Sequence, residues 1–249
     1  MNPLNAKEEK VTLELSYAQK TIGMIGGTSW ESTLLYYKWI NQAVRAHLGG
    51  IHSAKLLLYS MNYEPIVSLE NQGKWEEVGK QLGHAAKVLQ EGGADFLILC
   101  CNTLHKATPF IEDAIAIPFL HIADAAGKIL SNNQKRTVGL LGTQFTMEDG
   151  FYASRLKEKF NLDVLVPQLE ERIRMDTLIY QELCRGKVLP RSKAEAKRMM
   201  QDLKNAGAEA ILLACTELGM LVQEEDAVIP IYDTALLHAQ EAVRISLLD

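Results

Sequence analysis

The sequence contains few cysteines, prolines and aromatic residues, and each shortage excludes a class of protein. Only 4 cysteines and 7 prolines occur among 249 residues, and aromatic side chains make up 7%. So few cysteines exclude a disulfide-rich scaffold, and no CxxC pair or His/Cys cluster has the spacing of a zinc site. The sequence therefore predicts free thiols in a reducing compartment and no metal centre.

Strong positive charge and long apolar runs are also absent. The net charge is −5, and no block of lysine and arginine occurs, which argues against nucleic acid as a partner. No apolar run approaches the roughly 18 residues of a membrane helix. The N-terminal MNPLNAKEEK lacks the apolar core of a secretory signal. We therefore expect a cytoplasmic protein without a membrane partner.

The chain alternates between short apolar runs and longer helical patterns, which is typical of parallel βαβ units. Residues 11–15 (VTLEL) predict either an edge strand or a loosely held arm, and residues 63–73 are expected to form a loop. The expected strands are 21–27, 53–62, 96–100, 116–122, 163–167, 210–215 and 228–233, with another at the start of 136–152. The expected helices are 28–48, 74–91, 104–115, 123–131, 148–160, 170–186, 191–206, one that starts near 217, and 234–247.

The second half of the chain repeats the first. LQEGGADFLILCCNT (89–103) and LKNAGAEAILLACTE (203–217) align at an offset of 114, which superposes Cys101 on Cys215. KTIGMIGG (20–27) is similar to RTVGLLGT (136–143) at an offset of 116. The dipeptide IP occurs at 117–118 and again at 229–230, at an offset of 112. Three landmarks in the same order indicate an internal duplication.

The duplication predicts an α/β fold of two similar parallel-sheet domains related by a pseudo-two-fold axis, with the active site in the cleft between them. We expect residues 1–120 to form the first domain and residues 121–230 the second, with the C-terminal segment 231–249 packing back on the first. Ligands of such sheets bind beyond the carboxyl ends of the strands. Cys101 and Cys215 both lie at such ends, so we expect them to face each other across the cleft.

Two facing cysteines favour acid–base chemistry. Cys100 is interpreted as structural, because its side chain must point away from that of Cys101 on a strand. Cys184, near the end of a helix, is interpreted as structural too. Where a strand gives way to a helix, free backbone N–H groups and the helix dipole favour a thiolate. A thiolate can remove a proton from one face of a carbon while the second thiol protonates the other face. The pair therefore predicts stereoinversion by a two-base mechanism.

Polar residues beside the cysteines suit an amino-acid substrate. Asn102, Thr103 and Thr216 offer donors for a carboxylate, together with the amides of the helices that follow. Two further loops, 26–29 and 142–144, are expected on the same rim. A phosphate ligand is disfavoured, because neither a GxxxxGK[ST] motif nor a complete GxGxxG motif occurs.

These motifs together identify a family. From about Lys20 to the C-terminus, the chain resembles the aspartate/glutamate racemases, which are cofactor-independent amino-acid racemases. The segments that carry the resemblance are GMIGGTSWEST (23–33), LGGIHSAKLLLYS (48–60), LCCNTLHK (99–106), IPFLHIADA (117–125), LLGTQFTME (140–148), ACTELG (214–219) and IPIYDT (229–234). The resemblance implies an isomerase that uses no pyridoxal phosphate and no metal, and a homodimer.

The resemblance also implies roles for individual residues. Cys101 and Cys215 match the two catalytic cysteines. The α-carboxylate ligands correspond to Asn102, Thr103 and Thr143, with Thr216 nearby. The segment that covers the substrate corresponds to Thr28, Ser29 and Trp30. His52 stands where some relatives have an arginine that binds the side-chain carboxylate, and Arg174, or alternatively Arg172, lies near the position of a basic side-chain ligand.

The leading hypothesis is a racemase of aspartate, glutamate or a broader set of amino acids. One alternative keeps the fold but uses a single cysteine, as in an isomerase or a decarboxylase. Another is a non-catalytic amino-acid-binding protein. His52 leaves the specificity for dicarboxylates open, because a histidine with an ordinary pKa near 6.5 is a weaker carboxylate ligand than arginine.

Overall fold

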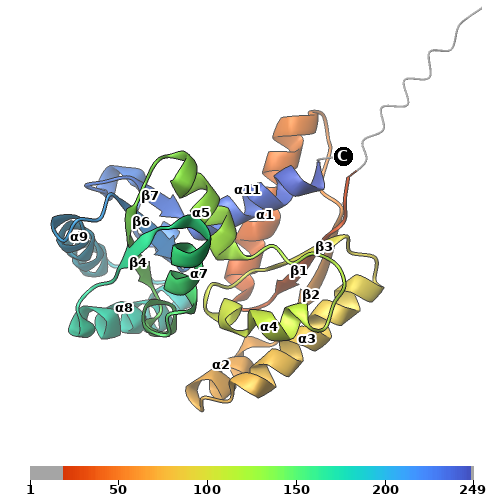
Figure 1. Cartoon of the computed structure of the whole chain (residues 1–249), viewed down its shortest axis with the longest axis horizontal. Helices are drawn as coiled ribbons and strands as arrows, with labels where there is room; N and C mark the ends of the chain where they lie inside the picture. The colour runs from red at the N-terminus through yellow and green to blue at the C-terminus, as the bar shows by residue number, and fades with distance from the viewer. Residues whose placement is uncertain (1–18, 248–249) are drawn as a thin grey trace, which may run out of the picture.

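The computed structural model describes residues 19–247, so the strand or arm expected at 11–15 lies outside the described residues. Two parallel sheets lie side by side, each with helices on both faces (Figure 1). The first sheet has the order β2-β1-β3 and the second the order β5-β4-β6-β7. The strands are β1 (Ile22–Gly26), β2 (Leu56–Ser60), β3 (Phe96–Leu99), β4 (Thr137–Gly142), β5 (Asp163–Leu165), β6 (Ala210–Ala214) and β7 (Ile231–Asp233).

The two sheets share one topology, as the duplication predicts. The second sheet repeats the first when β4, β5 and β6 are matched with β1, β2 and β3. The counterpart of β7 in the first sheet is a single parallel bridge between Leu97 and Phe119. The expected fold class, two similar parallel α/β units, is therefore confirmed.

Helices cover both faces because the strands are apolar on both sides. The longer helices are α1 (Trp30–Leu48), α2 (Tyr63–Asn71), α3 (Trp75–Glu91), α5 (Ile122–Asn132), α7 (Phe151–Phe160), α8 (Leu169–Gln181), α9 (Pro190–Asn205) and α11 (Thr234–Ser246). The short helical segments are η1 (Thr103–Ala107), α4 (Thr108–Glu112), α6 (Gln144–Glu148), η2 (Leu183–Arg185), α10 (Leu218–Leu221) and η3 (Glu224–Asp226).

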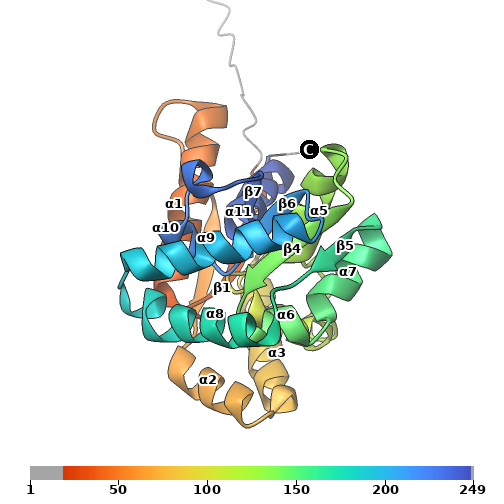
Figure 2. The ribbon, with the colours of Figure 1, turned by 90° about the vertical axis from the view of Figure 1, so that its left-hand side faces the viewer.

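Each sheet separates two apolar cores. In the first sheet, α3 packs on one face, and α1 and α11 pack on the other. In the second sheet, α5 and α7 cover one face, and α8 and α9 cover the opposite one (Figure 2). Side chains alternate along β3, so Ile98 and Cys100 join the core under α1 while Cys101 lies on the opposite side.

The last helix returns to the first sheet. Ala235, Ala239 and Val243 of α11 pack in the same core as Ile22 and Met24 of β1. Figure 1 shows α11 passing between the two sheets, and it contacts both α1 and α5. The domain limits at 120 and 230 stay a prediction, but this packing agrees with a C-terminal segment that belongs with the first sheet.

Several local expectations are wrong. Residues 63–73, expected as a loop, contain α2, whose Pro65 lies in the first turn, where a missing N–H costs nothing. The strand expected at 116–122 shrinks to one bridge beside Pro118, which cannot donate to a ladder. The helix expected at 104–115 is a 3₁₀ segment followed by the five-residue α4. The helix expected at 148–160 is interrupted at Gly150.

The N-cap of α11 gives a prediction about stability and pH. The Asp233 carboxylate accepts the backbone N–H groups of Ala235 and Leu236, at 2.9 and 3.1 Å, yet burial raises its pKa to about 6. A folded-state pKa above the unfolded value means that stability falls as pH rises from about 4 through 6.

We expect Asp233→Asn, which keeps the cap without the charge, to be at least as stable as the wild type at pH 8. Asp233→Ala should be about 1 kcal/mol less stable than Asp233→Asn at both pH values, because the cap is lost. Urea unfolding at pH 4.5 and pH 8 measures both effects. Equal pH dependence in the wild type and the asparagine variant would contradict the assignment.

Candidate functional site

The two cysteines meet at a small cavity between the sheets. Cys101 follows β3 and Cys215 follows β6, which are equivalent strands of the two sheets, and both line the same space of about 30 Å³. Both residues are buried. The other lining residues are Thr28, Ser29, Tyr63, Asn102, Thr103, Thr143, Ile179, Tyr180, Cys184, Ala214, Thr216 and Glu217. The cavity has room for about one water molecule.

Most of the site residues expected from the sequence come together here. Besides the two cysteines, the residues that share this cavity are Thr28, Ser29, Asn102, Thr103, Thr143 and Thr216. They come from the carboxyl ends of four strands in two sheets, which is where the fold places ligands. Trp30 lies beside them, but it lines a second, larger cleft and its side chain is exposed.

The larger cleft lies outside the cysteine cavity and has a volume of about 1070 Å³. Ser29, Tyr63, Tyr180 and Cys184 line both spaces, and we call these four residues the neck. Tyr63 belongs to α2 and Tyr180 to α8, so the neck joins the two halves of the molecule. A ligand in the outer cleft must pass the neck to reach the thiols.

The loop after β1 is fixed by a glycine and a helix cap. Gly27 has a φ of +82°, and a Cβ there would lie 2.2 Å from the carbonyl oxygen of Met61. Only glycine fits this position, in both conformation and space. Ser29 then caps α1 and accepts the N–H of Ser32. The turn thereby directs Thr28 and Ser29 toward the cysteines.

A buried carboxylate holds the Cys215 side of the cavity. The Cys215 thiol donates to Glu217 Oε2 over 3.0 Å, and the Thr216 hydroxyl donates to the same oxygen over 2.6 Å. Glu217 Oε1 accepts from Ser29 over 2.9 Å and from Ser32 over 3.1 Å. All four donors of this carboxylate lie in the interface between the two halves of the chain.

Cys101 has different partners. Burial, followed by the negative charge of Glu70, raises the pKa of the Cys101 thiol to about 12. The backbone N–H groups of Leu104 and Thr103 face the sulfur and lower this pKa, but their effect is smaller. Burial followed by the Glu217 charge likewise raises the pKa of Cys215. The local strand-to-helix setting was expected to favour thiolates. In the closed cavity, desolvation outweighs it, and the helical segments that follow the cysteines are only four and five residues long.

Hydroxyl groups and one amide complete the lining. Thr103 of the first half and Thr143 of the second form a hydrogen bond of 2.9 Å, and Thr143 also contacts Thr146 at 3.0 Å. Asn102 Nδ2 and Thr28 Oγ1 are buried without a hydrogen-bond partner. Buried donors without partners are rare and point to a ligand that supplies the missing acceptor.

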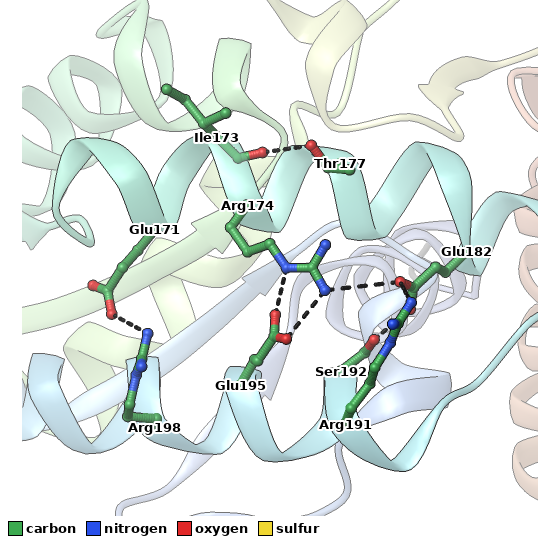
Figure 3. A network of polar contacts seen from close by, with 9 residues as sticks. All are labelled: Glu171, Ile173, Arg174, Thr177, Glu182, Arg191, Ser192, Glu195 and Arg198. Atoms are coloured by element: carbon green, nitrogen blue, oxygen red, sulfur yellow. Dashed lines mark hydrogen bonds and ion pairs between the residues drawn. The ribbon is translucent and has the colours of Figure 1, made fainter.

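The expected side-chain ligands do not reach the cavities. His52 lies between α1 and the amino end of β2, and it lines neither space. Arg174 points to α9, where Glu195 accepts two hydrogen bonds of 2.6 and 3.1 Å from its guanidinium (Figure 3). Arg172 pairs with Glu148 at 2.8 Å. Substrate-binding roles for His52 and Arg174 therefore stay predictions that the geometry does not support.

Three histidines lie behind Cys101 rather than in the cavity. His105 Nε2 accepts the N–H of Ile122, so the proton is on Nδ1, which donates to the Cys101 carbonyl over 2.7 Å. The His105 ring lies 4.5 Å from that of His121 and 5.8 Å from that of His238. Burial lowers the pKa of all three. These neutral rings support the backbone, and among residues 19–247 no three metal-ligating side chains form a metal site.

The sequence analysis did not single out Glu217, Ser32, Tyr63 or Tyr180 as site residues. Glu217 and Ser32 lie inside the motifs ACTELG and GMIGGTSWEST. For Glu217, the position two residues after Cys215 was the available signal. Tyr63 lies on α2, which was expected as a loop, and Tyr180 lies on the long helix α8. The position of Tyr180 depends on how α8 packs across the interface, which no local pattern specifies.

Comparison with known proteins agrees with this geometry. The family model "Asp/Glu/Hydantoin racemase" matches residues 25–242. A structure of a candidate Asp/Glu racemase from Yersinia pestis is 41% identical, with a TM-score of 0.87, and the match covers 92% of this chain and 100% of that one. An aspartate racemase homologue from Pyrococcus horikoshii is 32% identical, with a TM-score of 0.80, and the match covers 91% and 99%.

The broad specificity amino-acid racemase RacX of Bacillus subtilis is 26% identical over 171 residues, which are 68% of this chain and 72% of that one. The family model spans most of the chain and includes both cysteines with the loops around them. The resemblance inferred from the sequence motifs is thereby confirmed. The chain belongs to the Asp/Glu/hydantoin racemase family.

Proposed function

We propose that this protein is an amino-acid racemase that inverts Cα with two cysteines and without a cofactor. The observation that carries the proposal is the pair Cys101 and Cys215, which reach one cavity from equivalent strands of two repeated sheets. Membership in a racemase family, whose members are isomerases, supports the same reaction. The substrates expected from the sequence are aspartate, glutamate or a broader set of amino acids.

The proposed step balances as a transfer of two protons. One cysteine, as thiolate, removes the α-proton from one face of the substrate and becomes a thiol. The other, as thiol, donates its proton to the opposite face and becomes a thiolate. Cα is inverted, no net proton is consumed, and the two sulfurs have exchanged states.

The polar lining suits the α-carboxylate. Asn102 Nδ2 lacks an acceptor, and Thr28 Oγ1 lacks a partner. A carboxylate bound there would satisfy both groups and could also receive the hydroxyl protons of Thr103 and Thr143. Donors on the carboxylate also stabilise the charge that develops when the α-proton leaves.

Substrate binding must widen the cavity and change the ionisation of the thiols. A space of about 30 Å³ is smaller than any amino acid, so the walls must move apart at the neck. Burial disfavours both thiolates while the cavity is closed. The α-ammonium of a substrate brings a positive charge next to the sulfurs, which favours the thiolate.

The two cysteines are not equivalent before the first turnover. Cys215 donates its proton to Glu217, whereas Cys101 receives backbone N–H groups. We infer that Cys215 holds the proton at rest and that Cys101 ionises first. In this arrangement Glu217 is a positioning residue, since it acts on the substrate only through Cys215.

Two other functions are compatible with this fold. A single-cysteine isomerase or decarboxylase would share the fold, and unliganded arylmalonate decarboxylase does so at 15% identity and a TM-score of 0.51. That likeness concerns the fold alone, and two thiols on one cavity favour the racemase. A binding protein would not exchange the α-proton of its ligand.

A homodimer is the second part of the proposal. Trp30, Leu34 and Tyr37 repeat along one face of α1, and their side chains are 64%, 57% and 54% exposed. An exposed apolar face of this kind is typical of a protein interface.

Among residues 19–247, no helix is long and apolar enough to cross a membrane. The cytoplasmic location expected from the sequence stays a prediction.

The two-base mechanism predicts that each cysteine is required. We expect Cys101→Ala and Cys215→Ala each to lower kcat for racemisation by at least about 10³-fold, since a missing acid or base on either face blocks inversion. The assay is polarimetry on an amino-acid panel, with NMR detection of α-proton exchange in D₂O. Cys100→Ala, which faces the core under α1, is the matched control and should keep activity. Racemisation that survives both active-site substitutions would refute the mechanism.

The asymmetry between the thiols predicts their order of alkylation. Iodoacetamide should modify Cys101 before Cys215 in the wild type, because Cys215 donates to a carboxylate. Glu217→Gln should lower the pKa of Cys215 and narrow the difference in rate. Mass spectrometry of peptides from samples quenched over a range of pH gives both rates. Faster modification of Cys215 in the wild type would reverse the assignment.

The exposed face of α1 predicts a change in oligomeric state. We expect Leu34→Glu combined with Tyr37→Glu to convert a dimer to a monomer in light scattering after size exclusion. Val88→Glu, which changes a 38% exposed valine of α3, is the control and should leave the mass unchanged. A wild-type protein that is monomeric at micromolar concentration would exclude this interface.

A further inference from the structure

The outer cleft is lined by many acids and almost no bases. Among its lining residues, the one cationic side chain is Arg185, which is exposed on η2. The acidic lining residues are Glu31, Glu64, Glu148, Asp149 and Asp176. An anionic side chain of a bound amino acid would meet repulsion here, so the charge of the cleft bears on the class of substrate.

The other cations near the cleft are already neutralised by acids of the chain. Arg172 pairs with Glu148 at 2.8 Å, and Lys106 with Asp149 at 2.6 Å. Figure 3 shows the Arg174 guanidinium directed at Glu195, with Glu182 also within 3.9 Å. None of these groups is available to bind a second carboxylate of a substrate without losing an existing partner.

Several acids, in contrast, lack a cationic partner. Within residues 19–247, the carboxylates of Glu31 and Glu64 form no hydrogen bond or ion pair. The Asp176 carboxylate accepts one hydrogen bond, from the backbone N–H of Gln144 at 2.7 Å. Glu70 lies deeper on α2, where it is 2% exposed and both of its carboxyl oxygens lack a hydrogen-bond partner. Burial raises the pKa of the Glu70 carboxyl to about 7, and this residue lines neither the outer cleft nor the inner cavity.

These charges converge on the neck. Glu31 and Asp176 line the outer cleft together with the neck residues Tyr180 and Cys184. Tyr63 and Tyr180 add aromatic rings at the same place, and such rings attract cations.

The geometry of the inner cavity tells which part of a substrate faces the neck. The unpartnered Asn102 Nδ2 lies at the cavity wall and fits the α-carboxylate, while Cα must lie between the two sulfurs. The side chain then leaves through the neck into a cleft of about 1070 Å³. A long side chain with a terminal charge would place that charge among the carboxylates.

We propose that the preferred substrates carry a cationic side chain, such as lysine or ornithine, rather than a second carboxylate. The proposal rests on the racemase function proposed above, and it assigns Glu31 and Asp176 as the residues that select for the positive charge. It differs from the expectation of aspartate or glutamate, which relied on Arg174 and His52 as ligands.

A panel of substrates tests the proposal on the unmodified protein. Racemisation of lysine and ornithine is compared with that of norleucine and norvaline, which have nearly the same shape without the charge, and with aspartate and glutamate. We expect kcat/KM for lysine to exceed that for norleucine at least about tenfold, and to exceed those for both dicarboxylates. The preference for lysine should shrink as salt is raised, because exposed carboxylates are screened.

Substitution of the two acids tests which residues set the preference. Glu31→Gln with Asp176→Asn keeps both shapes and the acceptor for Gln144, and should lower the ratio of kcat/KM for lysine to that for norleucine about tenfold. Glu158→Gln, an exposed acid of α7 outside the cleft, is the matched control and should leave the ratio unchanged. Each single substitution is measured as well, so loss of folding in the double variant does not end the test.

The outcomes separate this proposal from the one on which it rests. Faster turnover of aspartate or glutamate than of lysine would overturn it, and a loss of that activity in Arg185→Ala would identify the anchor of the dicarboxylate. An equal rate for lysine and norleucine, or an unchanged ratio in the acid variants, would also overturn it. No α-proton exchange with any amino acid would instead reject the racemase function itself.

Discussion

The Glu217 carboxylate is the interaction on which the site depends. It is buried, and its four hydrogen-bond donors come from both halves of the chain: Ser29 and Ser32 at the start of α1, and Cys215 and Thr216 after β6. A buried carboxylate without donors costs several kcal/mol. The carboxylate is therefore satisfied only when the edges of the two sheets meet, and that contact also brings the thiols to one cavity.

The same closure explains why local rules misjudge the acidity of the thiols. Backbone N–H groups at a strand end do favour a thiolate, and they do so at Cys101. Burial at the interface opposes them and prevails, because removing water from a charge acts more strongly than two partial charges. The chemistry of the pair is therefore coupled to opening at the neck and to the charge of the ligand that enters.

The fold and the centre of the site could be predicted from the sequence because they are written in local, repeated patterns. The duplication predicted two similar parallel sheets, and it placed Cys101, Asn102 and Thr103 on the same rim as Cys215 and Thr216. The residues around the centre of the site could not be predicted in this way. The neck tyrosines come from α2 and α8, and the direction of Arg174 is set by Glu195 on a neighbouring helix. Such pairings depend on the packing of helices, which no single segment encodes.

The duplicated backbone carries side chains that differ between the halves, and these differences matter for catalysis. At the offset of 114, Asn102 corresponds to Thr216, and Thr103 corresponds to Glu217. One half therefore presents an amide and a hydroxyl beside its cysteine, while the other presents a hydroxyl and a carboxylate. The two sulfurs are equivalent in position, but only the first half presents an amide donor for a carboxylate beside its cysteine, while the carboxylate of the second half holds the Cys215 thiol. In the proposed reaction, two equivalent thiols act on opposite faces of Cα, while the polar groups beside them differ between the halves. The substrate can therefore be held in one orientation while its configuration is inverted.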